Sequence, residues 1–510
     1  MKIKTIKKWS IITLSVLTVI TVASFLWIQS QIKHHTGEKT ELVDTSIFKV
    51  SSTPLVIKNV SVLSTDCTNM IDSLIVIIEE GKIKQIAKNP NIPINYRIID
   101  GSGQYLIPGL VDTHAHLHRS KNDLLLYLAN GVTHISEMFG QERHLKWRKE
   151  AEEGALSPKI YVATSKIGSQ KQKGVIQKIR RLFGSMHNYT DSEKAKEAVI
   201  NYKEQGYDAI KLSTFLNAEI YQALVDESKR QNLPTVGHLT SSIGLKGLFV
   251  NGQSQLAHIE EITKATMYDF GGMNSSNAEE YLEYLKKNAN SIAIKLKEKN
   301  IVVSSTIFII ESIYKQNFEL KDFLKNIELE YQNPGEIEGS KFARGWLPGN
   351  NSYENMEIKN NPDLIEKYKI FWKTYAKAIH IMGKALVDNG VMITAGTDSN
   401  TAGVVAGFSL HDELEALKRI GMTNSQALYA ATVAPAKWMQ TDAGTIEIGR
   451  RADLILLNKN PLNNIKNTRS IDAVITNGRY LNRETLNKML QEVKKANNRS
   501  RELSIDEYLD

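Results

Sequence analysis

Between residues 110 and about 440 the sequence alternates regularly between two kinds of segment. Short apolar segments typical of buried strands are each followed by a longer segment typical of a helix. Repeated strand–helix units predict an α/β fold, here a (β/α)8 TIM barrel of roughly 250 residues plus insertions, which we expect to occupy residues 108–440. The eight strand-like segments read GLVDTHAH, GVTHISEM, KIYVATS, YDAIKLS, LPTVGHL, QLAHIEE, NIVVSSTI and GVMITAGTD.

Residues 310–378 interrupt this alternation between the seventh and the eighth strand-like segment. They are helical and polar in character, contain the run GWLPGN, and are too long for an ordinary connection. In a barrel of this kind the loops that follow the strands line the active site. We therefore expect the insertion to lie on the active-site face.

Both ends of the chain carry β-like segments outside this alternation. Residues 50–107 contain runs rich in Val and Ile that are separated by Gly, Asn and Asp, and residues 441–483 return to the same style. Such runs predict strands joined by turns. The simplest arrangement is one composite β-sandwich domain built from both chain ends, with the barrel inserted in it. Residues 484–510 are expected to form a charged helical tail.

Residues 1–33 differ in kind from the rest of the chain. Four lysines lie within the first eight residues, and no charged residue occurs from Trp9 to Ile32. A helix of that length crosses a hydrocarbon layer of roughly 30 Å. Bulky residues follow the apolar run where a secretory signal would carry small ones, so an uncleaved transmembrane helix is favoured over a cleaved signal.

The lysines ahead of this apolar run also predict its orientation. Lysines that precede a span favour a cytoplasmic N-terminus, which places everything after about residue 33 outside the cytoplasm. We expect a membrane-anchored, single-pass protein whose main domain is extracytoplasmic. The alternative is a secreted or periplasmic protein, released after signal cleavage.

Charge and cysteine usage narrow the classes of partner. The formal net charge is +8, but acidic and basic residues are interspersed, and no Lys/Arg cluster is interleaved with aromatic residues, so no nucleic-acid partner is expected. Cys67 is the only cysteine, which excludes an intramolecular disulfide and a thiolate metal cluster. The expected partners are a small-molecule substrate and the membrane, and a homo-oligomer is left open.

Several strand-like segments end in a group that can bind a metal or react. His114 and His116 are two residues apart and share one face if the first strand continues that far. Two imidazoles on one face suit a Zn-like metal, although such a pair alone fits a hydrogen-bonded surface feature equally well. Because strand ends converge on one face of a barrel, packing alone is a poor explanation for the full set. The other members are Lys211, His238, His258 and Asp398.

In this order, PGLVDTHAHLH, the lysine and histidine strand ends, TAGTDS and the closing run GTIEIGRRADLILL resemble the amidohydrolase superfamily. The resemblance covers nearly all of residues 54–480 and implies a metal-dependent hydrolase barrel with a composite β-sandwich. It implies that His114 and His116 bind one metal ion and that His238 and His258 bind a second. Asp398 would complete the first site and transfer the proton.

The resemblance gives Lys211 the most specific role. Its amine would be carboxylated by CO₂, because a carbamate offers two anionic oxygens that bridge metal ions roughly 3.5 to 4 Å apart. A hydroxide between two divalent ions, expected to be Zn²⁺, would then attack the carbonyl. Members with this lysine usually hydrolyse amide or ester bonds, whereas one-metal deaminase-like members usually lack it. The alternative for Lys211 is a salt bridge to Asp208 or Glu137.

The sequence around YDAIKLS and SLHDELEALKRIGMTNSQALYAAT is most similar to the branch of the superfamily that contains Xaa-Pro dipeptidases and imidazolonepropionase-like proteins. This predicts hydrolysis of the C–N bond of a dipeptide or an N-acyl amino acid. Members of the branch often carry an Arg-Asp pair after the second strand, where this chain has Ser136 and Glu137, so its substrate can differ. His118, His411 and Arg344 are the candidate substrate contacts, and for the first two a purely structural role is the alternative.

Two other functions fit the same residues. The centre could hydrolyse cyclic amides, esters or lactones with the same chemistry. A catalytically silent binding protein could also keep the barrel as a scaffold, because a fold does not imply a function. A silent relative should have lost at least one of the ligand residues, and this chain has the full set.

Overall fold

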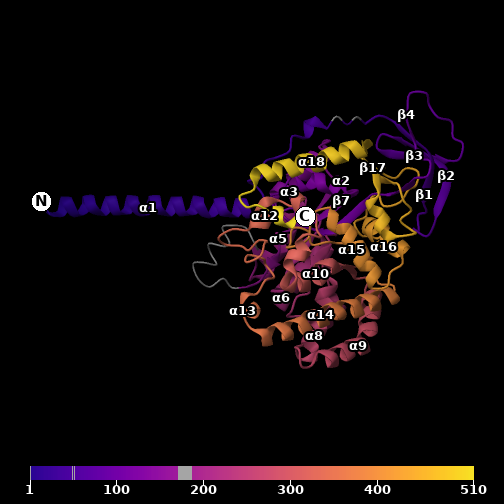
Figure 1. The fold of residues 1–510 in the computed structure, drawn as a ribbon. Helices are drawn as coiled ribbons and strands as arrows, with labels where there is room; N and C mark the ends of the chain where they lie inside the picture. Colours follow the sequence, from indigo (N-terminus) through magenta and orange to yellow (C-terminus); the bar gives the residue numbers. More distant parts are fainter. Residues whose placement is uncertain (1, 49, 51, 171–186, 510) are drawn as a thin grey trace.

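The computed structural model describes residues 2–48, 50, 52–170 and 187–509. Figure 1 shows one long helix, α1 (Lys2–His35), that extends far out from the rest of the molecule. All eight segments expected to be barrel strands contain a strand. These strands are β6 (Leu110–Ala115), β7 (Val132–Gly140), β8 (Lys159–Thr164), β11 (Ile210–Leu212), β12 (Thr235–Gly237), β13 (Gln255–Leu256), β14 (Val302–Ser304) and β15 (Ile393–Thr394).

The eight strands pair in parallel in three groups, β6-β7-β8, β11-β12 and β13-β14-β15. Backbone contacts join the groups: a bridge links Ala163 to Ala209 between β8 and β11, and the Ala257 N–H donates to the Gly237 carbonyl beside β12. The Thr113 N–H donates to the carbonyl of Ala395, 2.9 Å away, which connects the first strand to the last. The fold is TIM-barrel-like, and its strand ends meet on one face.

Two very short strands were not expected from the sequence. They are β9 (Ile167–Gly168) and β10 (His187–Asn188), and β9 pairs with β11 through Leu212. They widen the sheet at the carboxyl end of β11. Two-residue strands of this kind carry too little periodicity to be recognised in a sequence.

Helices follow the strands, and their ends match their sequence signals. The helix α6, for example, begins where the Asn217 side chain accepts the N–H of Ile220, and its apolar face, with Ile220 and Leu224, is buried. The helices between the strands are α2 (Asp123–Ala129), α3 (Glu142–Glu152), α5 (Ser192–Glu204), α6 (Ala218–Arg230), α7 (Gly244–Asn251), α8 (Ile259–Phe270), α9 (Ala278–Glu298), α10 (Ile307–Phe318), α11 (Leu320–Leu324), α12 (Pro334–Glu338), α13 (Met356–Lys359) and α14 (Pro362–Asp388). After β15 come α15 (Phe408–Arg419), α16 (Asn424–Ala431) and α17 (Val433–Trp438).

One eight-stranded sheet combines both ends of the chain. Its order is β18-β17-β16-β5-β1-β2-β3, with β4 beside β1, and the two ends meet where Ile107 pairs with Ile455. The sheet has its own buried core, to which Val60 and Ile475 contribute. Its strands are β1 (Leu55–Leu63), β2 (Met70–Glu79), β3 (Lys82–Ala87), β4 (Arg97–Asp100), β5 (Tyr105–Pro108), β16 (Leu454–Leu457), β17 (Ile471–Thr476) and β18 (Arg479–Asn482).

The C-terminal segment is a packed helix, α18 (Arg483–Ser500), followed by a 3₁₀ turn at Asp506–Tyr508. Leu486, Met489 and Val493 are buried, and α18 lies against α2. The Asn497 amide donates to the carbonyls of Tyr331 and Gln332 in the insertion, at 2.9 and 3.2 Å. The segment is the charged helix that the sequence predicted, but one face of this helix is apolar and packs against the body of the protein.

The helix α1 is one straight element of 34 residues with no buried apolar face along most of its length. Within the described residues it is the one helix long and apolar enough to cross a membrane, over Ile11–His35. A membrane anchor and a signal sequence both have this length and composition. Figure 1 shows that α1 leaves the body on the side away from β1 and β2.

Candidate metal centre

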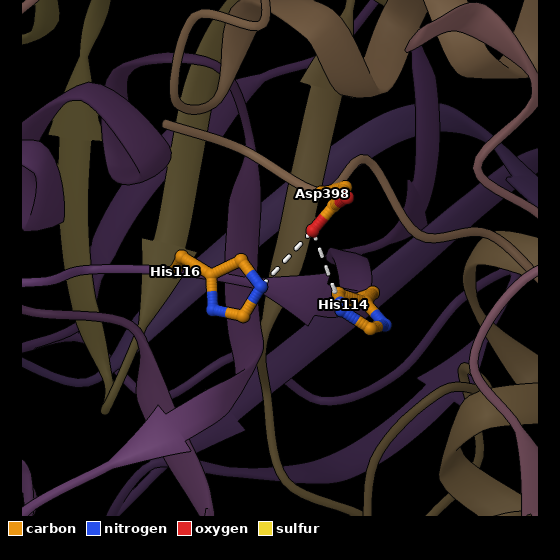
Figure 2. Close-up of side chains that lie close together, drawn as sticks. All are labelled: His114, His116 and Asp398. Atoms are coloured by element: carbon orange, nitrogen blue, oxygen red, sulfur yellow. Dashed lines mark ion pairs between the residues drawn. The ribbon is translucent and has the colours of Figure 1, made fainter. Parts of the chain in front are cut away.

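Three predicted ligands come together at the carboxyl ends of β6 and β15. Asp398 Oδ1 lies 3.0 Å from His116 Nε2 and 3.4 Å from His114 Nε2 (Figure 2). One ligand atom from each of the three lies within 4.8 Å of the others. His114 is on β6 and His116 directly follows it, so strand alternation puts both rings on one face, as the sequence predicted. The three residues form a candidate His-His-Asp metal site.

The backbone around Asp398 is held in a conformation that few residues adopt. Asp398 has φ 62°, and its N–H donates to the His114 carbonyl at 2.7 Å. The buried Asp112 side chain reinforces this contact, since it accepts the N–H and the hydroxyl of Thr397 at 3.0 and 2.6 Å. It also accepts the N–H of His114 at 3.1 Å. Asp112 therefore fixes the two strand ends against each other.

The two histidines predicted for a second metal ion lie beside this cluster. The ring centroid of His258 is 4.6 Å from that of His114 and 5.1 Å from that of His238. His238 follows β12 and His258 follows β13, so each ring enters from its own strand end. Four imidazoles from three strand ends thus converge on the face where a barrel carries its active site.

Lys211 lies on β11 between the two groups of histidines. Its side chain is fully buried, and Nζ lies 3.3 Å from His114 Nε2. Burial, then the charge of Lys166, lowers the pKa of Lys211 to about 7, against the carboxylate of Asp398. The alternative salt bridge to Asp208 does not form, because Asp208 pairs with Arg148 at 2.7 Å.

Burial favours the neutral form of His114 and His258. Burial lowers the pKa of His258 to about 3 and lowers the pKa of His114 well below its usual value, with Lys211 adding to the second shift. Burial alone would raise the pKa of Asp398, but the His116 hydrogen bond and the neighbouring His114 ring hold it well below its usual range. A cluster of neutral imidazoles around a carboxylate is the protonation state that a metal ion requires.

The outer nitrogen of each second-group histidine has a partner that fixes its ring. His238 Nδ1 lies 3.1 Å from Glu261 Oε1, and His258 Nδ1 lies 2.7 Å from Thr306 Oγ1. Metal-binding histidines are usually oriented in this way by a carboxylate or another polar group. The contacts leave Nε2 of both rings for the centre. Glu261 and Thr306 were not predicted, although Glu261 follows His258 by three residues in the same helix start.

The donor set fits a divalent metal ion. The Nδ1 atoms of His114 and His116 are buried without a hydrogen bond. Buried polar atoms without a partner are costly, and such atoms are often found at functional sites. Imidazole nitrogens and a carboxylate are the usual ligands of Zn²⁺ in sites without cysteine. Nε2 of both rings is directed to Asp398, the geometry expected if these atoms and the carboxylate share one ion.

Glu137 supports the first pair of histidines from behind. It is fully buried and accepts the N–H groups of Leu117 and Phe139 at 2.5 and 2.6 Å, and its Oε1 lies 3.9 Å from His116 Nδ1. Burial opposes ionisation, but His144 and His116 lower the pKa of Glu137 to about 2. Glu137, one of the two residues that stand where similar proteins often carry an Arg-Asp pair, is thus a buried carboxylate next to the predicted ligand His116.

His118 lies at the edge of the cluster and contacts the insertion. Its ring stacks on His116 with an interplanar angle of 11°, and its Nδ1 lies 2.6 Å from Glu336 Oε1 on α12. Its side chain is 27% exposed, so the ring borders both the cluster and solvent. This position is compatible with the predicted substrate contact.

The prediction of a substrate contact for His411 is wrong. His411 lies on α15 and is buried, with Nδ1 2.9 Å from Thr468 Oγ1 and Nε2 3.1 Å from the Asn130 carbonyl. Both ring nitrogens are therefore used by structural contacts. The helix turns this residue toward the packing interface rather than toward the strand ends.

The insertion offers Tyr353 where the sequence suggested Arg344. The Arg344 guanidinium donates to the Glu354 carbonyl at 2.6 Å and so closes its own loop. Tyr353, in the same loop, is half-buried, and burial followed by the charges of Asp398 and Glu260 raises its pKa. Because Arg344 is used within its own loop, Tyr353 is the residue of this loop that we consider for a substrate contact. Nothing in the local sequence distinguishes it from the other tyrosines of the insertion.

Comparison with known proteins agrees with this geometry. Residues 367–481, from α14 to β18 and including Asp398, match the model of the amidohydrolase family. This part of the chain is therefore similar to amidohydrolase domains. Relatives of the same superfamily include 5'-deoxyadenosine deaminase of Methanosphaera stadtmanae, 24% identical over 84% of this chain and 93% of the relative. Adenine deaminase of Clostridium perfringens is 22% identical over 79% of this chain and 55% of the relative.

Solved structures of amidohydrolases share the fold of this domain. Bottromycin amidohydrolase superposes with a TM-score of 0.67 at 18% identity, covering 91% of this chain and 96% of the other. A Xaa-Pro dipeptidase with bound methionine superposes with a TM-score of 0.58 at 17% identity, covering 84% of this chain and all of the other. These superpositions show that the chain shares the fold of these proteins.

Proposed function

We propose that this amidohydrolase is a binuclear metallohydrolase that cleaves the C–N bond of a small amide, such as a dipeptide or an N-acyl amino acid. One observation carries the proposal: Lys211 Nζ lies 3.3 Å from His114 Nε2, between the His114–His116–Asp398 group and the His238–His258 pair. The hydrogen bond from Thr113 to Ala395 supports a closed barrel, which would hold all six groups at one mouth.

The position of Lys211 supports a bridging role. A fully buried ammonium without a carboxylate partner would be costly, whereas a carbamate on the same nitrogen would carry two anionic oxygens toward both groups of histidines. The carbamate forms when the amine attacks CO₂ and loses one proton. We propose that this group, His114, His116 and Asp398 hold one ion, and that it holds a second with His238 and His258, with Zn²⁺ as the expected metal.

The residues of the chain would divide the remaining work. When bound, the metal ions supply Lewis-acid polarisation and a more acidic water. The Asp398 carboxylate has a side chain that is 20% exposed, so it can accept the proton of the attacking water and return it to the leaving nitrogen. Glu261, Thr306 and Asp112 would hold the ligands in place, and His118, whose ring stacks on His116, would contact the substrate.

Deamination is the second candidate function. The relatives named above are deaminases, and loss of ammonia from a purine is also hydrolysis of a C–N bond. Lys211 favours the amide hydrolase, because a single metal ion needs no bridging group. Release of ammonia from 5'-deoxyadenosine or adenine would favour the deaminase, and release of an amino acid from a dipeptide or an acyl amino acid would favour the amide hydrolase.

We propose further that α1 anchors the enzyme in a membrane with the barrel outside the cytoplasm. Exposed apolar side chains along the helix and lysines at its N-terminal end support this assignment. Cell fractionation tests it. An intact N-terminus in the membrane fraction is expected, and a shortened protein in the soluble extracytoplasmic fraction would show that the segment is a cleaved signal.

A library of dipeptides, N-acyl amino acids and purines tests the function. The metal-loaded protein is expected to hydrolyse members of the first two classes, and Lys211→Ala is expected to lose this activity. Lys159→Ala serves as the control, because Lys159 begins β8 at the opposite end of the barrel. Hydrolysis that is equal in the wild type and in Lys211→Ala would contradict the proposed mechanism.

A further inference from the structure

The end of α1 and the segment that follows it are seated on the catalytic face of the barrel. The Arg119 N–H, directly after the cluster, donates to the Thr36 carbonyl at 2.9 Å, and its guanidinium pairs with Glu38. The Thr40 hydroxyl donates to Asn333 Oδ1 at 3.0 Å in the insertion. These partners follow the carboxyl ends of β6 and β14. The membrane helix therefore joins the body at the mouth of the barrel, as far as the described residues show.

The helix α1 packs directly against α12 of the insertion. A side chain at Gly335 would bring a Cβ within 1.7 Å of the His34 carbonyl oxygen, so α1 and α12 touch through their backbones. His34 Nε2 also lies 3.1 Å from Glu338 Oε2, a buried carboxylate on α12. Gln31 accepts the N–H of Lys341 at 3.2 Å. The direction of α1 thus determines how the barrel is turned relative to a membrane that α1 crosses.

The length of α1 places this contact next to the membrane surface. The residues from Lys8 to Trp27 span about 30 Å at 1.5 Å per residue, which matches the hydrocarbon layer. From Trp27 to His34 the helix rises only about 10 Å further. A span that ends between Trp27 and His35 therefore puts the catalytic face, which begins at His34, at the membrane surface.

Exposed aromatic side chains lie at this end of α1 and in the loops at the carboxyl ends of the strands. The rings of Trp27 and Phe342 meet edge to face, with centroids 5.4 Å apart, and they are 50% and 56% exposed. Phe342 belongs to the insertion. Phe215, in the loop after β11, is also exposed, at 57%. Exposed aromatic residues are costly in water and are enriched at membrane–water interfaces.

A cavity of about 710 Å³ opens at the same place. Gln29 of α1 forms part of its wall, together with Arg119, Arg143 and residues at the carboxyl ends of β7 and β8, Gly140 and Ser165. The wall of this cavity therefore includes both α1 and Arg119, which directly follows His118 in the chain, while the six predicted metal ligands lie outside the wall. Arginines suit an anionic headgroup or a carboxylate, and here Arg119 and Arg143 both pair with Glu38, whose place an anionic headgroup would have to share or take.

We propose that the catalytic face of the barrel is turned toward the bilayer, with Trp27, Phe342 and Phe215 among the headgroups, and that the substrate is a membrane-borne amphiphile. This rests on the proposed amide hydrolase and its anchor. The substrate class is an amide with a hydrocarbon chain on its acyl group and an anionic group near the amide. The chain would stay in the lipid beside α1 while the headgroup enters the cavity next to Arg119 and Arg143.

Spin labels test the orientation without any assay of activity. The full chain with Cys67→Ser is labelled at Phe342→Cys, Phe215→Cys or, as a control, Val250→Cys, and reconstituted into phosphatidylcholine vesicles with one quarter phosphatidylglycerol. Val250 is 85% exposed at the end of α7 that leads into β13, on the opposite face. A nickel-chelating lipid is expected to broaden the signals at 342 and 215 at least fivefold more than at 250. Equal broadening at all three positions would overturn the orientation.

Paired substrates test the substrate class separately. The same acyl amino acid is offered with a short, soluble chain and with a long chain in vesicles. For Phe342→Ser we expect about a tenfold higher KM for the vesicle substrate and no change for the soluble one. An equal effect on both, or none on either, would overturn delivery from the membrane. If neither substrate is hydrolysed, the proposed function fails while the spin-label result still decides the orientation.

Discussion

Lys211 Nζ and His114 Nε2 face each other at 3.3 Å, and they come from strands at different positions in the barrel. The lysine is buried and has no carboxylate within salt-bridge distance among the described residues. This pair connects the His-His-Asp site to the two remaining histidines. It is the reason to expect two metal ions rather than one.

The orientation of His238 by Glu261 should be needed for metal binding. For Glu261→Gln we expect the affinity for the second metal ion to fall by 10- to 100-fold, because the amide supports the imidazole less well than the carboxylate does. Competition with a chelator measures the affinity. Glu260→Gln is the matched control, since Glu260 binds the Tyr375 hydroxyl at 2.7 Å instead of a histidine. Equal affinities in the two variants would exclude this role for Glu261.

Tyr353 should contribute to substrate binding and not to metal binding. For Tyr353→Phe we expect about a tenfold lower kcat/KM, the loss of one hydrogen bond of about 1.4 kcal/mol, with an unchanged metal content. Tyr314→Phe, on α10 with its ring tilted against that of Phe318, should behave like the wild type. A normal kcat/KM for Tyr353→Phe would remove this residue from the site.

His411 should matter for stability alone. Replacing it by Ala removes the contacts to Thr468 and to the Asn130 carbonyl, at a cost of about 2 kcal/mol in the free energy of unfolding. The kcat/KM of the folded protein should stay within about twofold of the wild type. A large fall in kcat/KM at full metal content would restore the substrate role that the structure argues against.

Glu413 should make stability depend on pH. Burial raises its pKa to about 7, although it accepts the N–H groups of Ile307 and Phe308. Because its pKa is higher in the folded protein than in the unfolded chain, protonation of Glu413 stabilises the fold. This contribution to the free energy of unfolding is fully present below about pH 4 and is lost as the pH rises through about 7. The shift corresponds to about 3 kcal/mol. For Glu413→Gln we expect a flatter dependence of the unfolding free energy on pH between 4.5 and 7. Denaturant titrations at several pH values measure this dependence, and the same dependence in the variant and in the wild type would contradict the prediction.

Much of the centre was predictable because strand geometry is regular. His114 and His116 alternate on one strand, and the other ligands each end an apolar run, so their convergence follows from a barrel. The supporting contacts were not predictable in the same way. Thr306 reaches His258 with φ 48°, a conformation that is unusual for a β-branched residue and that depends on the surrounding fold.

Residues on helices and in long loops were harder to place. The phase of α15 turned His411 into the core, and a one-residue difference in phase would have turned it elsewhere. Arg344 and Tyr353 lie in the same loop, and the contact between the Arg344 guanidinium and the Glu354 carbonyl, which removes Arg344 as a candidate, could not be read from the sequence. The apolar face of α18 was visible in the spacing of Leu486, Met489 and Val493, but not the surface that it covers.

The metal content of the purified full-length protein tests the central claim most directly. We expect close to two equivalents of divalent metal per chain in the wild type and in Lys159→Ala, and clearly fewer in Lys211→Ala, with loss of hydrolysis. Rescue of Lys211→Ala by short carboxylic acids at high concentration would identify the missing bridge. Equal metal content and equal activity in the wild type and in Lys211→Ala would contradict a binuclear centre built on this lysine.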